Sequence, residues 1–283
     1  MSVYDSKPER FLELLGSGSA SEFLSQYYCA GFDAGAWRCD EFAFHLAEWL
    51  PDYALREDEL AVHHGNALLK HNQAAVRVYT SEKYENRGEV GEIALHAICR
   101  DFFETVPISP RVFYKSASND VIKAFDMVHA RFPSHGKIEI WLGESKLYKD
   151  PKKAISDAIN SVSKHVDAGF LKNEKILLGP QIPKSTPHSD EVSKLFSKNG
   201  KIDDFLSAAV FPIGVFCESK AAATAAAADA AYVTSARAEL DAMSNAVMHS
   251  ELADKIRLAV IYIPIPKKAD IVKAFDKRLK GLQ

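Results

Sequence analysis

Residues 138–147 (IEIWLGESKL) constrain the fold most, because their apolar and polar residues alternate as they do in a β-strand. Residues two apart in a strand share a face, so three aliphatic residues lie on the same face as Glu144 and Lys146. An unpaired charge is costly to bury. We therefore expect this face to leave the core near Glu144, where its charges meet partners, a metal ion or solvent. A surface salt bridge at a strand end is the simpler alternative for an ExK pattern taken alone.

The surrounding pattern predicts an α/β fold with a mixed sheet that helices cover on both faces. Helices are expected at residues 41–49 before Pro51, at 88–103, from Pro151 onward with Asp150 as N-cap, and at 268–279. Strands are expected at residues 76–79, 111–115, 124–132, 138–147, 209–217 and 257–263. Residues 220–231 hold nine alanines in twelve positions and predict a surface helix that runs on towards His249, with a low-complexity or engineered insertion as the alternative.

We place a domain boundary near residue 85. Residues 1–85 are expected to form a mixed α/β N-terminal region, and residues 86–283 contain the segments with recognisable chemistry. The N-terminal region contains no chemistry that we can name, so we assign it a partner-docking surface by elimination.

The composition is that of a globular protein, with 47% hydrophobic residues in 283. No apolar run approaches the roughly 18 residues of a membrane-spanning helix. Residues 1–19 are charged and have no apolar stretch, which argues against a signal peptide. The four cysteines are scattered without a CxxC spacing, as expected of reduced thiols. We therefore expect a cytoplasmic protein without a membrane segment.

The net charge of −3 argues against a protein that coats nucleic acid with its whole surface. Residues 131–175 are the exception, because nine basic residues there stand against six acidic ones. Such an excess usually marks a solvated face. Here it matters because the stretch contains Glu144 and Lys146.

A second carboxylate is expected beside Glu144. In the predicted strand at 124–132, Asp126 is the only charge on a face of small and apolar residues. This strand precedes the Glu144 strand by one short connection, so the two carboxylates can meet at one point, as hard divalent cations such as Mg²⁺ prefer. A capped or turn-paired aspartate is the alternative. His129 follows Asp126 by three positions, points to the opposite face, and is expected to be structural rather than a catalytic base.

A third acid lies in the predicted helix at 88–103. Glu92 is in register with Leu95, Cys99 and Phe102, at the edge of the buried stripe. An acid in such a position suggests a functional partner, although an arginine could equally be that partner.

The order of these acids, on a helix (Glu92), on a strand (Asp126) and in a strand ExK motif (Glu144 and Lys146), resembles the PD-(D/E)xK nuclease superfamily. The core of that superfamily is an α/β sandwich with these elements in this order, so the resemblance implies a PD-(D/E)xK nuclease-like domain over residues 86–283. A narrower resemblance, to the HamA family of effectors of the Hachiman antiphage system, covers most of the chain. Its segments are residues 84–103 (YENRGEVGEIALHAICRDFF), 125–129 (FDMVH), 143–148 (GESKLY) and the stretch 31–60. The resemblance is weakest over the alanine-rich segment.

The resemblance implies a metal-dependent, largely sequence-nonspecific DNA nuclease in a bacterial antiphage complex. It also implies a HamB-like superfamily 2 helicase that restrains the nuclease until the helicase engages DNA. The chain has no Walker A motif, so an ATP-driven step would need another subunit.

Within this hypothesis we expect Mg²⁺, with Mn²⁺ as an alternative ion, to bind Asp126, Glu144 and the backbone carbonyl of Ser145. Glu92 is expected to bind the ion directly or through water. Lys146 would orient or deprotonate the attacking water and offset negative charge. The lysines expected to contact the DNA backbone are Lys149, Lys152, Lys153 and Lys164.

Two other functions compete with this hypothesis. One is a catalytically silent, nuclease-like module that docks on a helicase. The four charges kept against a core, at Glu92, Asp126, Glu144 and Lys146, count against it. The other is a restriction-like endonuclease with sequence preference, which the lack of an obvious recognition appendage disfavours.

Overall fold

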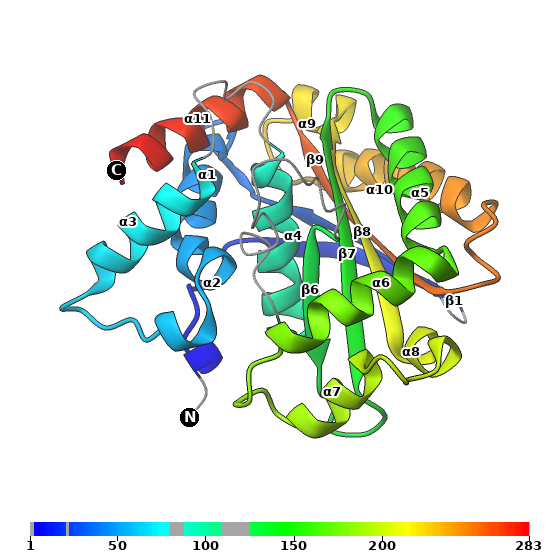
Figure 1. Ribbon diagram of the computed structural model, residues 1–283. Coiled ribbons are helices and arrows are strands. Elements are labelled where there is room, and N and C mark those ends of the chain that lie inside the picture. Colours follow the sequence, from blue (N-terminus) through cyan, green and yellow to red (C-terminus); the bar gives the residue numbers. More distant parts are fainter. Residues whose placement is uncertain (1–2, 21–22, 80–87, 109–124, 283) are drawn as a thin grey trace.

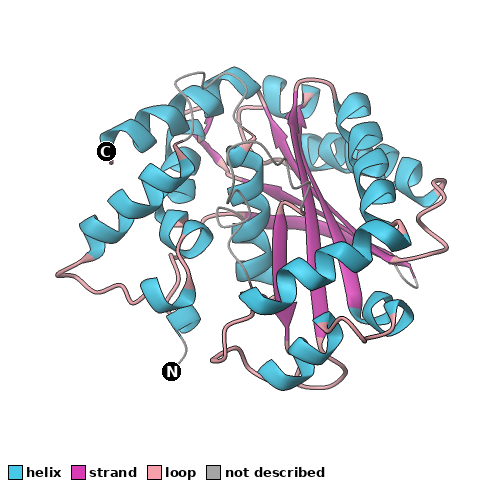
Figure 2. Ribbon diagram, in the orientation of Figure 1, coloured by secondary structure: helices cyan, strands magenta, loops and turns pink. Residues whose placement is uncertain are grey.

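The computed structural model describes residues 3–20, 23–79, 88–108 and 125–282 (Figures 1 and 2). A seven-stranded sheet with the order β1-β2-β9-β8-β7-β6-β5 runs through the molecule. Its strands are β1 (Glu13–Ala20), β2 (Phe23–Cys29), β5 (Val106–Pro107), β6 (Met127–Arg131), β7 (Glu139–Tyr148), β8 (Ala209–Glu218) and β9 (Arg257–Ile265). A separate hairpin consists of β3 (Phe32–Asp33) and β4 (Ala36–Trp37).

The four central strands β2, β9, β8 and β7 are parallel, whereas β1 and β6 pair antiparallel to their neighbours. Every residue of β8 except Glu218 is buried, as expected of a parallel strand that helices cover on both faces. The carboxyl ends of β7, β8 and β9 therefore meet at the same edge of the sheet.

Helices form a layer on each face of this sheet (Figure 2). The layer on one side, called the α4 face, contains α1 (Cys39–Glu48), α2 (Leu50–Ala54), α3 (Ala67–Val78), α4 (Glu89–Phe102) and α11 (Lys268–Gly281). The other layer, called the α5 face, contains α5 (Pro151–Val166), α6 (Ala168–Leu178), α7 (Ser189–Phe196), α8 (Ile202–Ala208), α9 (Lys220–Thr224) and α10 (Ala230–Met248). Short 3₁₀ turns occur at Val3–Asp5, Glu57–Glu59 and Gly179–Gln181. The predicted α/β class with a mixed sheet is confirmed.

Most predicted elements are present. The helices α1, α4, α5 and α11 and the strands β6, β7, β8 and β9 match their predicted segments, and Asp150 caps α5 by accepting from two backbone N–H groups. Helix α1 ends before Pro51, which lies in the first turn of the next helix, α2. The strand predicted at 111–115 lies outside the described residues.

The strand predicted at 76–79 is wrong, because these residues end helix α3. Ala74, Ala75 and Val78 are buried, a spacing that fits one helical face. The two valines of a four-residue window suggested a strand, but so short a window cannot distinguish the two periods.

The alanine-rich segment forms two helices rather than one. Helix α9 ends at Thr224, Ala225 is extended with ψ 149°, and Asp229 caps α10 by accepting from the Tyr232 N–H at 2.9 Å. Alanine alone favours a continuous helix, but an aspartate cap favours a new start. The predicted single surface helix is therefore interrupted.

Strands from both sides of residue 85 pair in the same sheet, because β2 lies beside β9. The domain boundary placed there stays a prediction. Over the described residues, none of the helices has the length and apolar character needed to cross a bilayer.

Candidate functional site

Asp126 joins the start of β6 to β7. Its backbone N–H donates to the carbonyl of Gly143 at 2.9 Å, and its Oδ2 accepts from the N–H of Ser145 at 2.8 Å. Met127 pairs with Gly143 in the ladder, so the Asp126 side chain continues the pairing one residue beyond the strand. The carboxylate is thereby fixed against the β7 backbone, directly beside the residue that follows Glu144.

Glu144 and Lys146 lie on the β7 face that carries Ile140 and Leu142, which pack in the core of the α5 face. The Lys146 Nζ lies 2.5 Å from Glu144 Oε1, and the two side chains are 18% and 4% exposed. The face therefore leaves the core at Lys146, one strand repeat later than the expected position at Glu144.

Both carboxylates affect the pKa of Lys146. Burial lowers the pKa of Lys146, but the charges of Glu144 and then Asp126 outweigh burial, so the pKa is raised. The amine is thus a cation at neutral pH, with both carboxylates close enough to stabilise its charge.

His165, in the last turn of α5, is a residue of this site that the sequence analysis missed. Its Nδ1 lies 3.8 Å from Glu144 Oε2. The ring centroid lies 4.7 Å from that of Phe125 and 4.9 Å from that of Phe170, so aromatic rings hold the imidazole over the carboxylate. The signal was present in the sequence, because His165 follows Val162 by three positions and continues the buried stripe of α5.

Glu92 belongs to the opposite face of the sheet. Helix α4 packs so closely on β7 that a Cβ on Gly91 would lie 2.7 Å from Ser145 Oγ, and only glycine allows this approach. Glu92 Oε2 accepts from the Tyr53 hydroxyl of α2 at 2.6 Å. In the described part of the chain, no three His, Cys, Asp or Glu side chains form a set that could hold a metal ion, so Glu92 is not grouped with the two strand acids. Its role at a metal ion stays a prediction.

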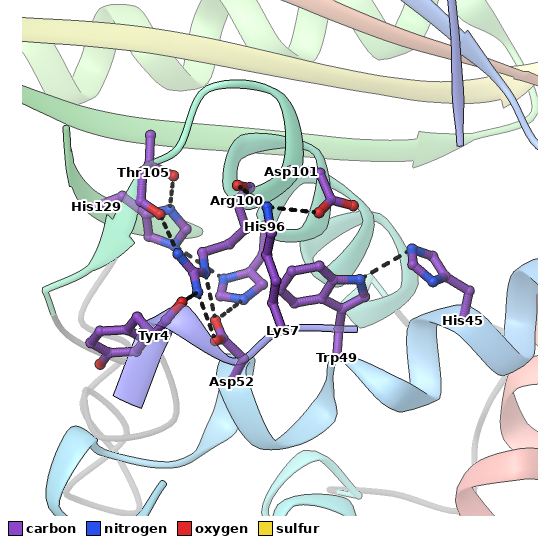
Figure 3. Close-up of polar contacts among 10 residues, drawn as sticks. All are labelled: Tyr4, Lys7, His45, Trp49, Asp52, His96, Arg100, Asp101, Thr105 and His129. Atoms are coloured by element: carbon purple, nitrogen blue, oxygen red, sulfur yellow. Dashed lines mark hydrogen bonds and ion pairs between the residues drawn. The ribbon is translucent and has the colours of Figure 1, made fainter. Parts of the chain in front are cut away.

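A second polar cluster lies on the α4 face (Figure 3). We call it the α4 network, and its buried residues are Asp52, His96, Arg100, Thr105 and His129. His96 Nε2 lies 2.8 Å from Asp52 Oδ1, and His96 Nδ1 lies 3.0 Å from His129 Nε2. His129 Nδ1 lies 2.7 Å from Thr105 Oγ1, and the Arg100 Nε donates to Asp52 Oδ1 at 3.1 Å. His129 thus faces away from the candidate site, as predicted, and anchors β6 from behind.

The family model of HamA matches residues 11–279 of the 283-residue chain. The chain belongs to the HamA family. No curated protein matches it. HamA membership fits a component of the Hachiman antiphage defence, and the mixed seven-stranded architecture is consistent with an α/β nuclease-like core.

In this HamA chain, the donor chemistry at β6 and β7 fits Mg²⁺. Asp126 and Glu144 supply carboxylate oxygens from neighbouring strands, and Mg²⁺ is commonly held by one or two carboxylates with its remaining positions left to water and phosphate. The buried pair would hold the ion, and the Ser145 carbonyl is the further ligand that we predict.

The four predicted DNA-binding lysines lie in two places. Lys149 follows β7 directly, and Lys152 and Lys153 lie in the first turn of α5. Lys164 lies in the last turn of the same helix, about 18 Å from Lys152 at the rise of an α-helix. Contact of these lysines with DNA stays a prediction, and the first three form one group.

Proposed function

We propose that this HamA chain is a metal-dependent, largely sequence-nonspecific DNA nuclease, acting as the effector of a Hachiman complex under the control of a HamB-like helicase. The observation that carries the proposal is the hydrogen bond from the Ser145 N–H to Asp126, which fixes one carboxylate beside the Glu144–Lys146 pair of the next strand. Membership of the HamA family supports the defence context.

The position of each side chain suits a step of phosphodiester hydrolysis. Asp126 and Glu144 would hold a Mg²⁺ ion, which would supply a Lewis acid and an activated water. The Lys146 ammonium, kept protonated by its neighbours, orients the attacking water and offsets the negative charge that develops on the phosphate. Lys146 and His165 approach different oxygens of Glu144, so both orient its carboxylate.

Cleavage of supercoiled plasmid by the purified chain tests the nuclease activity. We expect nicked and linear products with Mg²⁺ or Mn²⁺, none with EDTA, and rates at least about 100-fold lower for Glu144→Ala and Lys146→Ala, because each loses a group that stabilises charge. Glu251→Ala and Lys255→Ala are matched controls, because these residues form an exposed pair of the same types 3.4 Å apart. Undiminished nicking by Lys146→Ala contradicts the proposed site.

Regulation is tested with the partner present. If the chain cuts only, or much faster, when a HamB-like helicase, ATP and DNA are added, helicase control is supported. A chain that binds the helicase and stays inert under all these conditions is the competing silent docking module.

A further inference from the structure

Lysines follow each of three adjacent parallel strands at the same edge of the sheet. The ladders place the last residues of β7 beside those of β8, and those of β8 beside those of β9. We call the following six residues the lysine edge: Lys149, Lys152 and Lys153 after β7, Lys220 after β8, and Lys267 and Lys268 after β9. Figure 1 shows the three connections along the upper edge of the molecule, where these strands lead into α5, α9 and α11.

The carboxylates at this edge are turned towards helix N-termini. Asp150 Oδ1 accepts from the backbone N–H of Lys152 at 2.8 Å, and Glu218 Oε1 accepts from the backbone N–H of Lys268 at 2.9 Å. Both acids therefore cap helices, α5 and α11, and the positive ends of the two helix dipoles offset their negative charges.

Few of the ammonium groups are neutralised by a close carboxylate. Lys153 lies 2.7 Å from Asp157 and Lys267 lies 3.8 Å from Asp270, both on the surface. The other four lysines of the edge form no ion pair with a described residue. The three connections thus carry more lysine ammonium groups than there are ion pairs to neutralise them among the described residues.

Two of these lysines repel each other. Lys268 is half-buried, and its pKa is lowered by burial and then by the charge of Lys149, while Glu218 opposes the shift. This repulsion adds to the cost of burying the Lys268 ammonium group. A polyanion bound across both residues would remove that cost.

We infer that the lysine edge binds the phosphate backbone of a nucleic acid, with Lys220, Lys267 and Lys268 extending the contact from β7 to α11. Ligands of parallel α/β sheets bind at the carboxyl ends of the strands. Neighbouring strands lie about 4.8 Å apart, so the three connections span about 10 Å, the length of about three phosphates on one duplex strand.

The path of the nucleic acid, from the candidate site to the lysine edge, rests on the proposed nuclease function. Lys146 precedes Lys149 by three residues, about 10 Å at strand rise, so DNA that passes the candidate site continues onto the lysine edge. Binding itself does not depend on cleavage, and the two can be measured separately.

Fluorescence anisotropy of a labelled 20-bp DNA duplex in EDTA, where metal-dependent cleavage cannot occur, tests the inference. We expect the triple variant Lys220→Gln, Lys267→Gln, Lys268→Gln to bind about tenfold more weakly at moderate salt. The slope of log K against log salt should fall by up to about 2.7, because each phosphate contact contributes about 0.9. The control triple Lys137→Gln, Lys194→Gln, Lys201→Gln removes the same charge from exposed lysines around a cavity at the opposite end of β7, and we expect it to bind as the unmodified chain does.

Equal weakening in both triples, or no weakening in the edge triple, overturns the inference. The inference is also overturned if the edge triple binds vesicles containing phosphatidylserine more weakly than the unmodified chain does but binds the DNA duplex equally well. Thermal unfolding checks the fold, and the double variant of the exposed Lys220 and Lys267 replaces the triple if the half-buried Lys268 is needed for folding. If the chain binds DNA through this edge but does not cut plasmid, the proposed function is wrong and the inference stands. If the chain cuts plasmid but the edge triple binds DNA as the unmodified chain does, the inference is wrong and the proposed function stands.

Discussion

The two faces of the sheet each carry a buried polar cluster, and the clusters differ in the balance of carboxylates and cations among their described residues. In the α4 network, a carboxylate is matched by a guanidinium, and every ring nitrogen of two histidines has a partner. On the α5 face, two carboxylates lie beside one ammonium group. Closed networks of buried polar groups stabilise a unique packing, whereas an excess of buried negative charge is what a site for a cation requires.

The α4 network also determines where its protons lie. Asp52 can only accept, so His96 donates from Nε2 and accepts at Nδ1 from the His129 Nε2–H, and His129 Nδ1 accepts from the Thr105 hydroxyl. Burial lowers the pKa of His96, although Asp52 opposes the shift. Burial and then the charges of His96 and Arg100 lower the pKa of His129 further. Both imidazoles are therefore neutral near pH 7, and the chain of donors runs in one direction.

The largest effect is expected from Asp52→Ala, which leaves the Arg100 guanidinium buried without its carboxylate. Removing one partner of a buried ion pair costs about 3–5 kcal/mol. Urea unfolding measures the change. Asp241→Ala is the control, because Asp241 pairs with Arg237 on the surface and its loss should cost less than about 1 kcal/mol. Similar losses of unfolding free energy in Asp52→Ala and Asp241→Ala would show that the α4 network does not stabilise the fold more than a surface ion pair does.

A buried carboxylate outside both clusters, Glu174 on α6, tests whether the partners within a network are what make buried charge tolerable. Glu174 is 3% exposed, and its Oε2 has no hydrogen-bond partner among the described residues. Burial raises its pKa from 4.5 to about 7. The raised folded-state pKa means that stability is full below about pH 4.5, falls as the pH rises towards 7, and stays reduced above it.

We therefore expect Glu174→Gln to raise the free energy of unfolding at pH 8 relative to the unmodified chain by about 3 kcal/mol, and by much less at pH 5. Urea unfolding at the two pH values measures this difference. Glu251→Gln is the exposed control, because Glu251 pairs with Lys255 on the surface, and it should change the free energy of unfolding by less than about 1 kcal/mol at either pH. An equal effect of Glu174→Gln at both pH values would mean that the carboxylate is not the group that titrates.

The sequence predicts the fold wherever a pattern is long. The helix at 88–103 shows its period over more than ten residues, and the buried strand at 209–217 is an unbroken apolar run. Residues 76–79 are too few to show either pattern. The strands β1 (ELLGSGSA) and β2 (FLSQYYC) lack a clean alternation. Strand β2 joins the sheet by pairing with β9, more than 200 residues away in the chain, and β1 joins it by pairing with β2. Such long-range pairing leaves no local signal.

Part of the candidate site follows from alternation within strands. Placing Asp126 beside Glu144 and Lys146 needs only the two-residue period and adjacent strands, and both are present. His165 was missed because its contact with Glu144 arises from how α5 crosses β7. The position of Glu92 depends on which face of the sheet α4 covers, and a helical stripe predicts burial without predicting the face.

The smallest effect is expected from Thr105→Val, which keeps the shape of the side chain and removes one donor from the α4 network. The Nδ1 of His129 then loses its partner, at a cost of about 1 kcal/mol in urea unfolding. Plasmid cleavage should be unchanged, because Thr105 contacts the back of β6 and the candidate site lies on the other face. A strong loss of cleavage with this small loss of stability would mean that β6 transmits strain from His129 to Asp126. The two clusters would then be a single coupled unit, and the distinction between a stabilising face and a ligand-binding face would fail.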